Sequence, residues 1–169
     1  MDYNRSMKEI QLTQGKIAIV DDEDFERVSA RRWFAVKYAN YGGEKFLALT
    51  NIKKADGKWT NISLHRFIMN PPIGVEVDHI NKDTLDNQKA NLRLASRSQN
   101  ARNRSMFSNN KSGFKGVYFC KRIQRFIAQI ICNKKRYKLG HFHTAIDAAK
   151  AYNDAAIKFH GEFASLNKL

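Results

Sequence analysis

Asp78 and His79 stand side by side at the start of a polar run rich in asparagine, aspartate and lysine. An imidazole titrates near neutral pH, so a histidine can take a proton from an attacking water. A carboxylate can hold a hard divalent cation, which neutralises charge on a phosphate and accepts its oxygens. The pair therefore contains two of the groups that phosphodiester hydrolysis needs. Neighbours on a regular strand point to opposite faces, so we expect the strand to end or distort here.

A second metal ligand is expected, because one carboxylate alone holds Mg²⁺ poorly. Ser96 and Gln99 have the spacing of a capping box, which predicts a helix directly after Ser96. Asn100 then falls in the second helical turn, and Asn103 lies one turn later on the same face. A helix packed across the two strands could aim this face at Asp78, so either amide could supply the second oxygen ligand.

The elements that must position these residues are mainly strands in the first part of the chain. Apolar runs separated by turn residues predict strands over residues 10–64. A short helix is expected over 64–69, because an Asn-Pro-Pro sequence follows and ends it. Over residues 75–104 the pattern predicts a strand, a long loop over 81–90, a second strand over 92–95, and then the capped helix.

The charge of the chain indicates a polyanionic partner. The formal net charge is +14, with 15 basic and 13 acidic residues up to residue 96, but 15 basic and only 3 acidic residues from residue 97 onward. So basic a segment is typical of proteins that bind nucleic acids. We expect nucleic acid rather than a membrane surface, because the sequence has neither a basic amphipathic helix nor an apolar anchor.

The cysteines give little chemistry of their own. Cys120 and Cys132 are the two cysteines of the chain, and no apolar leader opens it, so we expect reduced thiols in a cytoplasmic protein. Two cysteines cannot form a cysteine-rich zinc site, so any metal must be held by Asp, Asn or His.

The basic C-terminal segment predicts a small domain of its own. A polar stretch over 105–112 predicts a linker. Strands are expected over 116–120, 126–132 and 136–139. A cap at Thr144 predicts a helix to about Phe159. The buried face of that helix is predicted to carry Ile146, Ala149, Tyr152, Ala156 and Phe159, and surface or strand-end positions are expected for His141, His143 and His160.

The blocks around Asp78 and His79 resemble those of the HNH endonucleases, specifically the phage and intron homing type. The resemblance implies a ββα-metal finger over about 75–104. The last position of the motif is often His in this family but Asn in the homing subgroup, and here it falls on Asn100. The matching blocks are Leu64-His65-Arg66, Val77-Asp78-His79-Ile80-Asn81, Leu85-Asp86-Asn87, Asn91-Leu92-Arg93 and Ser98-Gln99-Asn100-Ala101-Arg102-Asn103.

The resemblance also implies roles for single residues. His79 would be the general base, and Asp78 would bind the metal together with Asn100. Asn91 would hold the loop, since an amide side chain has both a donor and an acceptor. Oxygen ligands favour Mg²⁺ or Mn²⁺ over zinc. Accessory roles are expected for His65, Arg93 and Asn103.

Residues 112–167 resemble the APETALA-type DNA-binding domain of plant transcription factors, which also occurs attached to phage HNH nucleases. The main matching words run from Gly113 to Tyr118, from Phe126 to Ile130, from Lys138 to Phe142 and from Ala148 to Ala156. The resemblance implies a three-stranded antiparallel sheet on one helix, with the open face of the sheet in the major groove. DNA contacts are expected from Lys115, Tyr118, Lys121, Arg122, Arg125, Lys134, Arg136 and Lys138.

The predicted fold is α+β, with a β-rich scaffold and finger over 1–104, a linker over 105–112 and a DNA-binding domain over 113–169.

The main hypothesis is a metal-dependent endonuclease that cuts double-stranded DNA. We expect a monomer rather than a dimer, encoded by a phage or mobile element of a bacterial host. The rival is a non-catalytic DNA-binding regulator with a decayed nuclease core. An RNA-binding protein is the third alternative, although the exposed aromatic platform of common RNA modules is absent. Intact Asp78, His79, Asn91 and Asn100 favour the enzyme.

Overall fold

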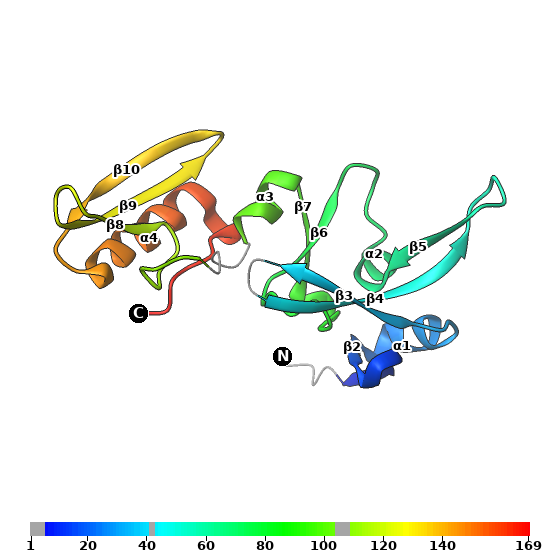
Figure 1. Cartoon of the computed structure of the whole chain (residues 1–169). Helices are drawn as coiled ribbons and strands as arrows, with labels where there is room; N and C mark the ends of the chain where they lie inside the picture. The colour runs from blue at the N-terminus through cyan, green and yellow to red at the C-terminus, as the bar shows by residue number, and fades with distance from the viewer. Residues whose placement is uncertain (1–5, 41–42, 104–108) are drawn as a thin grey trace. The chain divides into compact units, whose positions relative to one another are not determined.

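The computed structural model describes residues 6–40, 43–103 and 109–169. Residues 105–108 of the predicted linker, and residue 104 at the end of the predicted finger, lie outside these ranges. The chain forms two compact units, one that reaches Arg97 and one that runs from Ser98 to Leu169. The α+β prediction is confirmed, because the chain contains several small antiparallel sheets together with helices (Figure 1). No described helix has both the length and the apolar character needed to cross a membrane.

The N-terminal unit begins with a two-stranded antiparallel sheet. Strand β1 (Met7–Gln11) pairs with β2 (Ile17–Asp21), and helix α1 (Asp22–Ser29) follows at once. The acidic run 22–24 ends the predicted strand, but it also starts this helix, which the expectation of mainly strands did not contain. Acidic side chains are favourable in the first turn of a helix, where the N–H dipoles point outward.

A three-stranded sheet and a short helix complete the scaffold. The sheet has the order β3-β4-β5, and the tip of its β4–β5 hairpin projects from the unit (Figure 1). Helix α2 has the predicted bounds, and Asn70 closes it in a left-handed conformation with φ of 40° before the two prolines. The elements are β3 (Phe34–Asn40), β4 (Gly43–Lys53), β5 (Trp59–Ser63) and α2 (Leu64–Met69).

The predicted finger strands are β6 (Glu76–His79) and β7 (Leu92–Ala95), which pair antiparallel. Their apolar residues Val77 and Leu92 join one buried core with Ala18, Val20, Val28, Trp33 and Leu64. The scaffold and the two finger strands are thus held by the same apolar core. Helix α3 (Arg97–Arg102) begins where it is predicted, and residues from Ser98 onward belong to the second unit.

The C-terminal unit is the predicted three-stranded sheet packed on one helix. The order is β10-β9-β8, and helix α4 (Ala145–His160) covers one face (Figure 1). The side chain of Thr144 accepts a hydrogen bond from the Asp147 N–H, as its cap spacing predicts. The remaining elements are β8 (Val117–Cys120), β9 (Arg125–Cys132), β10 (Lys135–Phe142) and a single 3-10 turn over Gly161–Phe163.

Two predictions about α4 are wrong. Ile146 is 50% exposed and does not belong to the buried face, whose apolar members are Ala148, Ala149, Tyr152 and Ala156. His160 is not a surface residue, because its ring is buried and its Nε2 lies 3.1 Å from the Ile131 carbonyl oxygen. The buried face of α4 therefore begins at Ala148 rather than Ile146 and extends to His160.

Candidate active site

Asp78 and His79 lie at the end of β6, and both are buried, with 5% and 6% of their surface exposed. The strand ends at His79, where the His79 carbonyl oxygen accepts a hydrogen bond from the Lys82 N–H at 3.0 Å. The predicted strand end is confirmed. Burial of two polar side chains side by side is unfavourable unless each has partners, so their contacts identify what holds them.

Asp78 pairs with Arg93, its direct neighbour on β7. Both Nε and Nη2 of Arg93 donate to Oδ2 of Asp78, at 2.9 and 2.7 Å. The two side chains are 6% and 12% exposed, so the ion pair compensates a buried carboxylate. Any cation bound by Asp78 would share its carboxylate with this guanidinium.

His79 is oriented by Asn87, a residue of the loop between the finger strands. Nε2 of His79 lies 3.3 Å from Oδ1 of Asn87, which is 1% exposed. Nδ2 of Asn87 donates to the Leu85 carbonyl oxygen at 2.9 Å, and this fixes which end of the amide is the oxygen. Because that oxygen can only accept, Nε2 must carry the ring proton when His79 is neutral. Nδ1 is then the basic nitrogen.

Asn87 is itself fixed by strand β2. The Asn87 N–H donates to the Ile19 carbonyl oxygen at 2.8 Å, and the Ile19 N–H donates to the Leu85 carbonyl oxygen at 2.8 Å. Ile19 thereby forms a parallel bridge with Asp86. Asn87 was part of a motif block but received no role from the sequence. Its burial beside His79 depends on this long-range pairing, which local spacing does not reveal.

His65 packs against His79. Their rings meet edge to face with centroids 5.0 Å apart, and Nε2 of His65 lies 3.0 Å from the Ser63 hydroxyl oxygen. Burial, and then the charges of His79 and Arg66, lower the pKa of His65 to about 3. His65 therefore stays neutral at physiological pH and constrains the neighbouring ring by contact.

The pKa of His79 is also lowered by burial, against smaller raising effects of the Asn87 hydrogen bond and the Asp78 charge. A lowered pKa leaves the imidazole neutral at pH 7. A neutral imidazole is the form that can accept a proton from water. The environment thus keeps His79 in the state that a general base requires.

Asn91 joins the two ends of the same loop. Its Oδ1 accepts from the Asn81 N–H at 2.9 Å, its Nδ2 donates to the Asp86 carbonyl oxygen at 2.8 Å, and its own carbonyl accepts from the Ile80 N–H at 2.9 Å. Donor and acceptor of one amide are both used to hold backbone.

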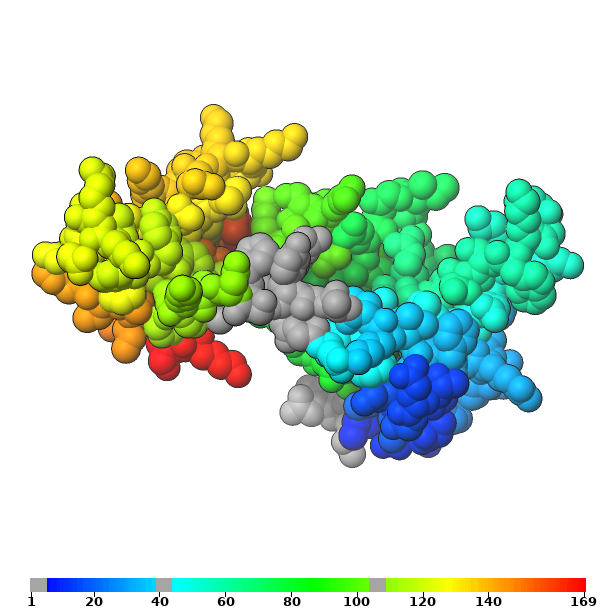
Figure 2. Space-filling view, viewed as in Figure 1, coloured from blue at the N-terminus to red at the C-terminus, as the bar shows by residue number. Residues whose placement is uncertain are grey.

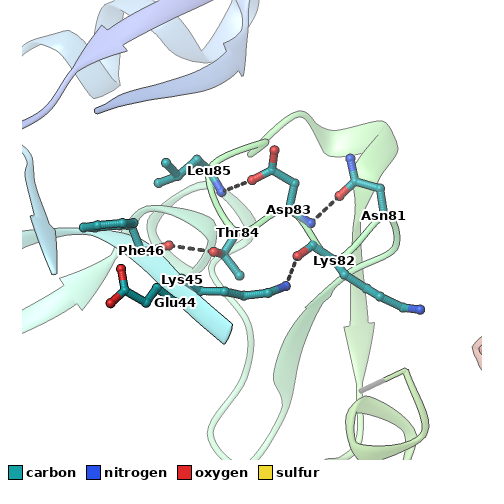
Figure 3. A pocket seen from close by; sticks show the side chains of 8 residues that line it. All are labelled: Glu44, Lys45, Phe46, Asn81, Lys82, Asp83, Thr84 and Leu85. Atoms are coloured by element: carbon teal, nitrogen blue, oxygen red, sulfur yellow. Dashed lines mark hydrogen bonds between the residues drawn. The ribbon is translucent and has the colours of Figure 1, made fainter. Parts of the chain in front are cut away.

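Strand β4 braces this loop from another side. A pocket of about 410 Å³ lies between the start of β4 and the loop, and Figure 3 shows the side chains around it. Nζ of Lys45 donates to the Lys82 carbonyl oxygen, and the Thr84 hydroxyl donates to the Phe46 carbonyl oxygen at 2.6 Å. Neither Asp78 nor His79 lines the pocket, and the two hydrogen bonds beside it join β4 to the loop.

A cluster of carboxylates at the start of α1 fastens the end of the loop. Asp21, Glu23 and Asp24 lie close enough to share a cation. The ammonium of Lys89 lies 2.7 Å from Glu23 Oε1 and 3.2 Å from Asp24 Oδ2, and the Lys89 N–H donates to Asp21 Oδ2 at 2.7 Å. A cationic side chain of the loop is therefore already within the cluster.

The remaining predicted site residues belong to the second unit. Asn100 lies on α3 and is half-buried, and Asn103, the first residue after that helix, is 5% exposed. The Asn103 N–H donates to the Asn100 carbonyl oxygen at 3.2 Å. That Asn100 completes a metal site with Asp78 stays a prediction.

The basic residues predicted to contact DNA occupy three kinds of position. Val117 and Ala128 face α4, so their neighbours Tyr118 and Ile127, which pair with each other, belong to the opposite face. The same alternation puts Arg125, Arg136 and Lys138 on that face. Lys121, Arg122 and Lys134 lie in the turns between strands. Lys115 differs, because it is half-buried before β8 and its Nζ donates to the Arg102 carbonyl oxygen at 2.6 Å.

The chain was compared with known proteins. Residues 70–102 match the family described as HNH endonuclease. An uncharacterized HNH endonuclease of Acanthamoeba polyphaga mimivirus is 34% identical over 114 residues, which cover 64% of this chain and 58% of that relative. No solved structure matches. The matched segment 70–102 contains Asp78, His79, Asn87, Asn91 and Arg93, so the site described above lies in the part of the chain that is similar to HNH endonucleases.

Proposed function

We propose that the protein is a metal-dependent DNA endonuclease of the HNH homing type. The observation that carries the proposal is the pair at the end of β6, a neutral, oriented His79 beside the buried carboxylate of Asp78. A decayed nuclease would have no need to keep a buried histidine with a chosen tautomer beside a paired carboxylate. The similarity of residues 70–102 to HNH endonucleases supports the same activity.

The donor set fits a hard cation. HNH nucleases generally use a divalent metal, and the carboxylate of Asp78 with the amide oxygen of Asn100 offers the oxygen ligands that Mg²⁺ or Mn²⁺ prefers. Zinc fits less well, because His79 is turned toward Asn87 and the site has no cysteine. When bound, the cation supplies charge neutralisation at the phosphate and the leaving oxygen.

The residues of the chain divide the remaining tasks. His79 takes a proton from the attacking water at Nδ1, while Asn87 keeps the ring in place through Nε2. Asn91 holds the loop, and His65 limits rotation of the His79 ring. Arg93 keeps the buried carboxylate of Asp78 compensated. The products are a 5′-phosphate and a 3′-hydroxyl, as in the family that the sequence resembles, and Asn103 is an accessory residue.

In this proposal the C-terminal unit binds double-stranded DNA. We assign it to the APETALA type, with residues 113–169 as the DNA-binding domain, 105–112 as linker and 1–104 as the nuclease part. Helix α4 covers one face of its sheet, and the open face carries Tyr118, Arg125, Arg136 and Lys138. Phosphate contacts would position the unit and a few base contacts would choose the site. Each chain would have one active site, so a monomer would nick one strand, whereas a dimer could cut both. We propose the monomer, encoded by a phage or mobile element and acting in the cytoplasm of the bacterial host.

The test is cleavage of duplex DNA with Mg²⁺ or Mn²⁺ by the wild type, His79→Ala and the control His143→Ala, whose residue is exposed on the second unit. Loss of a general base should lower the rate by about 100-fold or more, with DNA binding retained. The control should cleave like the wild type. Equal cleavage by His79→Ala would refute the proposal, and binding by all three proteins without any cleavage would favour the non-catalytic regulator.

A further inference from the structure

The outward face of the β4–β5 hairpin carries four exposed side chains in two facing pairs. Lys53 pairs with Trp59, and Asn51 pairs with Asn61. Residues two apart on a strand share a face, so the four side chains form one surface. All four are exposed, and Trp59 has 69% of its surface accessible.

Packing within the protein does not explain this face. The opposite face of the ribbon, with Thr50, Ile52 and Ile62, is buried or half-buried and connects the hairpin to its unit. Asn is depleted in strands, yet Asn51 and Asn61 face each other in the middle of one. Within the described part of the chain, neither amide side chain forms a hydrogen bond. Residues that break a local preference without a structural gain often mark function.

The hairpin tip adds positive charge. Every residue over 53–59 is exposed, and the tip projects from its unit (Figure 2). It carries Lys53, Lys54 and Lys58, whereas its single acid, Asp56, accepts a hydrogen bond from the Lys58 N–H at 3.0 Å. The turn is closed by a hydrogen bond of 2.8 Å from the Lys54 N–H to the Lys58 carbonyl oxygen. A formed, basic and unburied ribbon complements a polyanion.

We propose that this ribbon face, defined by Asn51, Lys53, Trp59 and Asn61, docks in a groove of duplex DNA. The major groove admits a two-stranded ribbon, and an Asn amide matches the donor and acceptor on the groove edge of adenine. The lysines contact phosphates, and the Trp59 indole packs on the apolar surface of sugar or a thymine methyl. The inference rests on the proposed function for its partner, and it adds a second DNA contact, made by the nuclease unit itself.

Tryptophan quenching tests the contact directly. Trp33 is buried with its Nε1–H bonded to the Val28 carbonyl oxygen, so acrylamide in solution reaches mainly Trp59. The probe is a mixed-sequence duplex, added with a chelator to prevent cleavage. The accessible component should fall severalfold once a gel shift shows saturation. Unchanged quenching of the bound protein would overturn the inference.

Matched charge variants test the lysines. The triple variant Lys53→Gln, Lys54→Gln, Lys58→Gln should flatten the dependence of log K on log salt by about two to three units, because each lost phosphate contact removes about 0.9. The control removes three exposed lysines on and after α4, through Lys150→Gln, Lys158→Gln and Lys168→Gln. Its slope should stay near that of the wild type, and equal slopes for the two triple variants would refute the inference.

The two asparagines should act on affinity rather than on the salt slope. Asn51→Ala and Asn61→Ala should each weaken binding about tenfold with an unchanged slope, measured on the tightest-binding duplex that the wild type selects from a mixed-sequence pool. Thermal unfolding of every variant checks that the fold is kept. The binding measurements contain no metal, so they are independent of cleavage. If the protein never cuts DNA but bound DNA shields Trp59 from acrylamide, only the nuclease proposal is refuted. If the protein cuts DNA but bound DNA leaves Trp59 accessible, only the ribbon contact is refuted.

Discussion

The two units of the chain use polar residues in opposite ways. The N-terminal unit buries them: Asp78, His79, Asn87 and Asn91 all have less than a tenth of their surface exposed. The C-terminal unit keeps its core apolar and puts charge on the open face of the sheet. Buried polar groups must be fully bonded, which makes their geometry rigid and specific. Exposed charges tolerate single changes, and their summed field attracts partners of opposite charge.

The difference teaches what each unit is built to do. The proton transfer that we propose for His79 needs one tautomer and one ring orientation, and the loop beside His79 is held by β2, by β4 and by α1 at once. The DNA binding that we propose for the C-terminal unit needs charge density more than exact placement of single atoms, so a simple helix–sheet core is enough. A substitution that disturbs the backbone should therefore unfold the C-terminal unit. In the N-terminal unit, the loss of one hydrogen-bonding atom should be enough to lower the cleavage activity that we propose.

Gly116→Ala should give the largest effect, in the C-terminal unit. Gly116 has φ of +76°, and an added Cβ would lie 2.1 Å from the Tyr152 ring. Strained backbone and overpacking each destabilise by about 1–3 kcal/mol, so we expect a loss of about 3 kcal/mol or more. Both tryptophans lie in the N-terminal unit, so Trp fluorescence reports on that unit while circular dichroism reports on both.

The expected outcome of Gly116→Ala is a lower transition by circular dichroism and an unchanged one by Trp fluorescence. A common shift of both transitions would show that the two units unfold as one and would contradict their separation. Gly113→Ala is the matched control, because its left-handed φ of +77° is the same but nothing lies within 4 Å of the added Cβ.

Asn87→Leu should lower kcat about 100-fold or more while duplex binding stays within about threefold, since general-base catalysis contributes about that much. The leucine cannot accept from Nε2, so His79 would lose its fixed tautomer. Nitrogen-15 NMR of neutral His79 should show the proton on Nε2 in the wild type and a mixture of tautomers in the variant. Asn87→Asp keeps an acceptor and should retain more activity than the leucine. A proton on Nδ1 in the active wild type would contradict the assignment.

Local patterns predicted the elements but not the partners of the buried polar residues. The helix over 64–69, both finger strands, and the strands and helix of the C-terminal unit follow from turn residues, caps and alternation, which are properties of neighbouring residues. The arrangement of those C-terminal strands as one sheet on one helix was implied by the family resemblance. Helix α1 was missed, because its eight residues begin with three acids and offer only Phe25 and Val28 as apolar positions. The helix packs against β1 and β2, and Val28 joins the core of the whole N-terminal unit, which the pattern of eight residues does not reveal.

The same limit explains the site. Asp78, His79 and Asn91 were found because their types and spacing resemble a known motif. Asn87 had no predicted role, since its contact with His79 depends on a bridge to Ile19, 67 or more positions away in the chain. His160 was assigned to the surface for a related reason: its partner, the Ile131 carbonyl, is 29 residues distant. Local spacing does not contain such pairings.

Acidic pH should give the smallest of these effects, and it concerns the N-terminal unit. An unfolded His65 takes up a proton below about pH 6.5, whereas the folded one stays neutral down to about pH 3. The folded state therefore has its full stability above pH 6.5 and loses it as the pH falls, by about 2 kcal/mol at pH 5. Urea unfolding followed by Trp fluorescence should show this loss, and His65→Gln should reduce it. If His65→Gln keeps the full acid sensitivity, groups other than His65 cause the loss of stability.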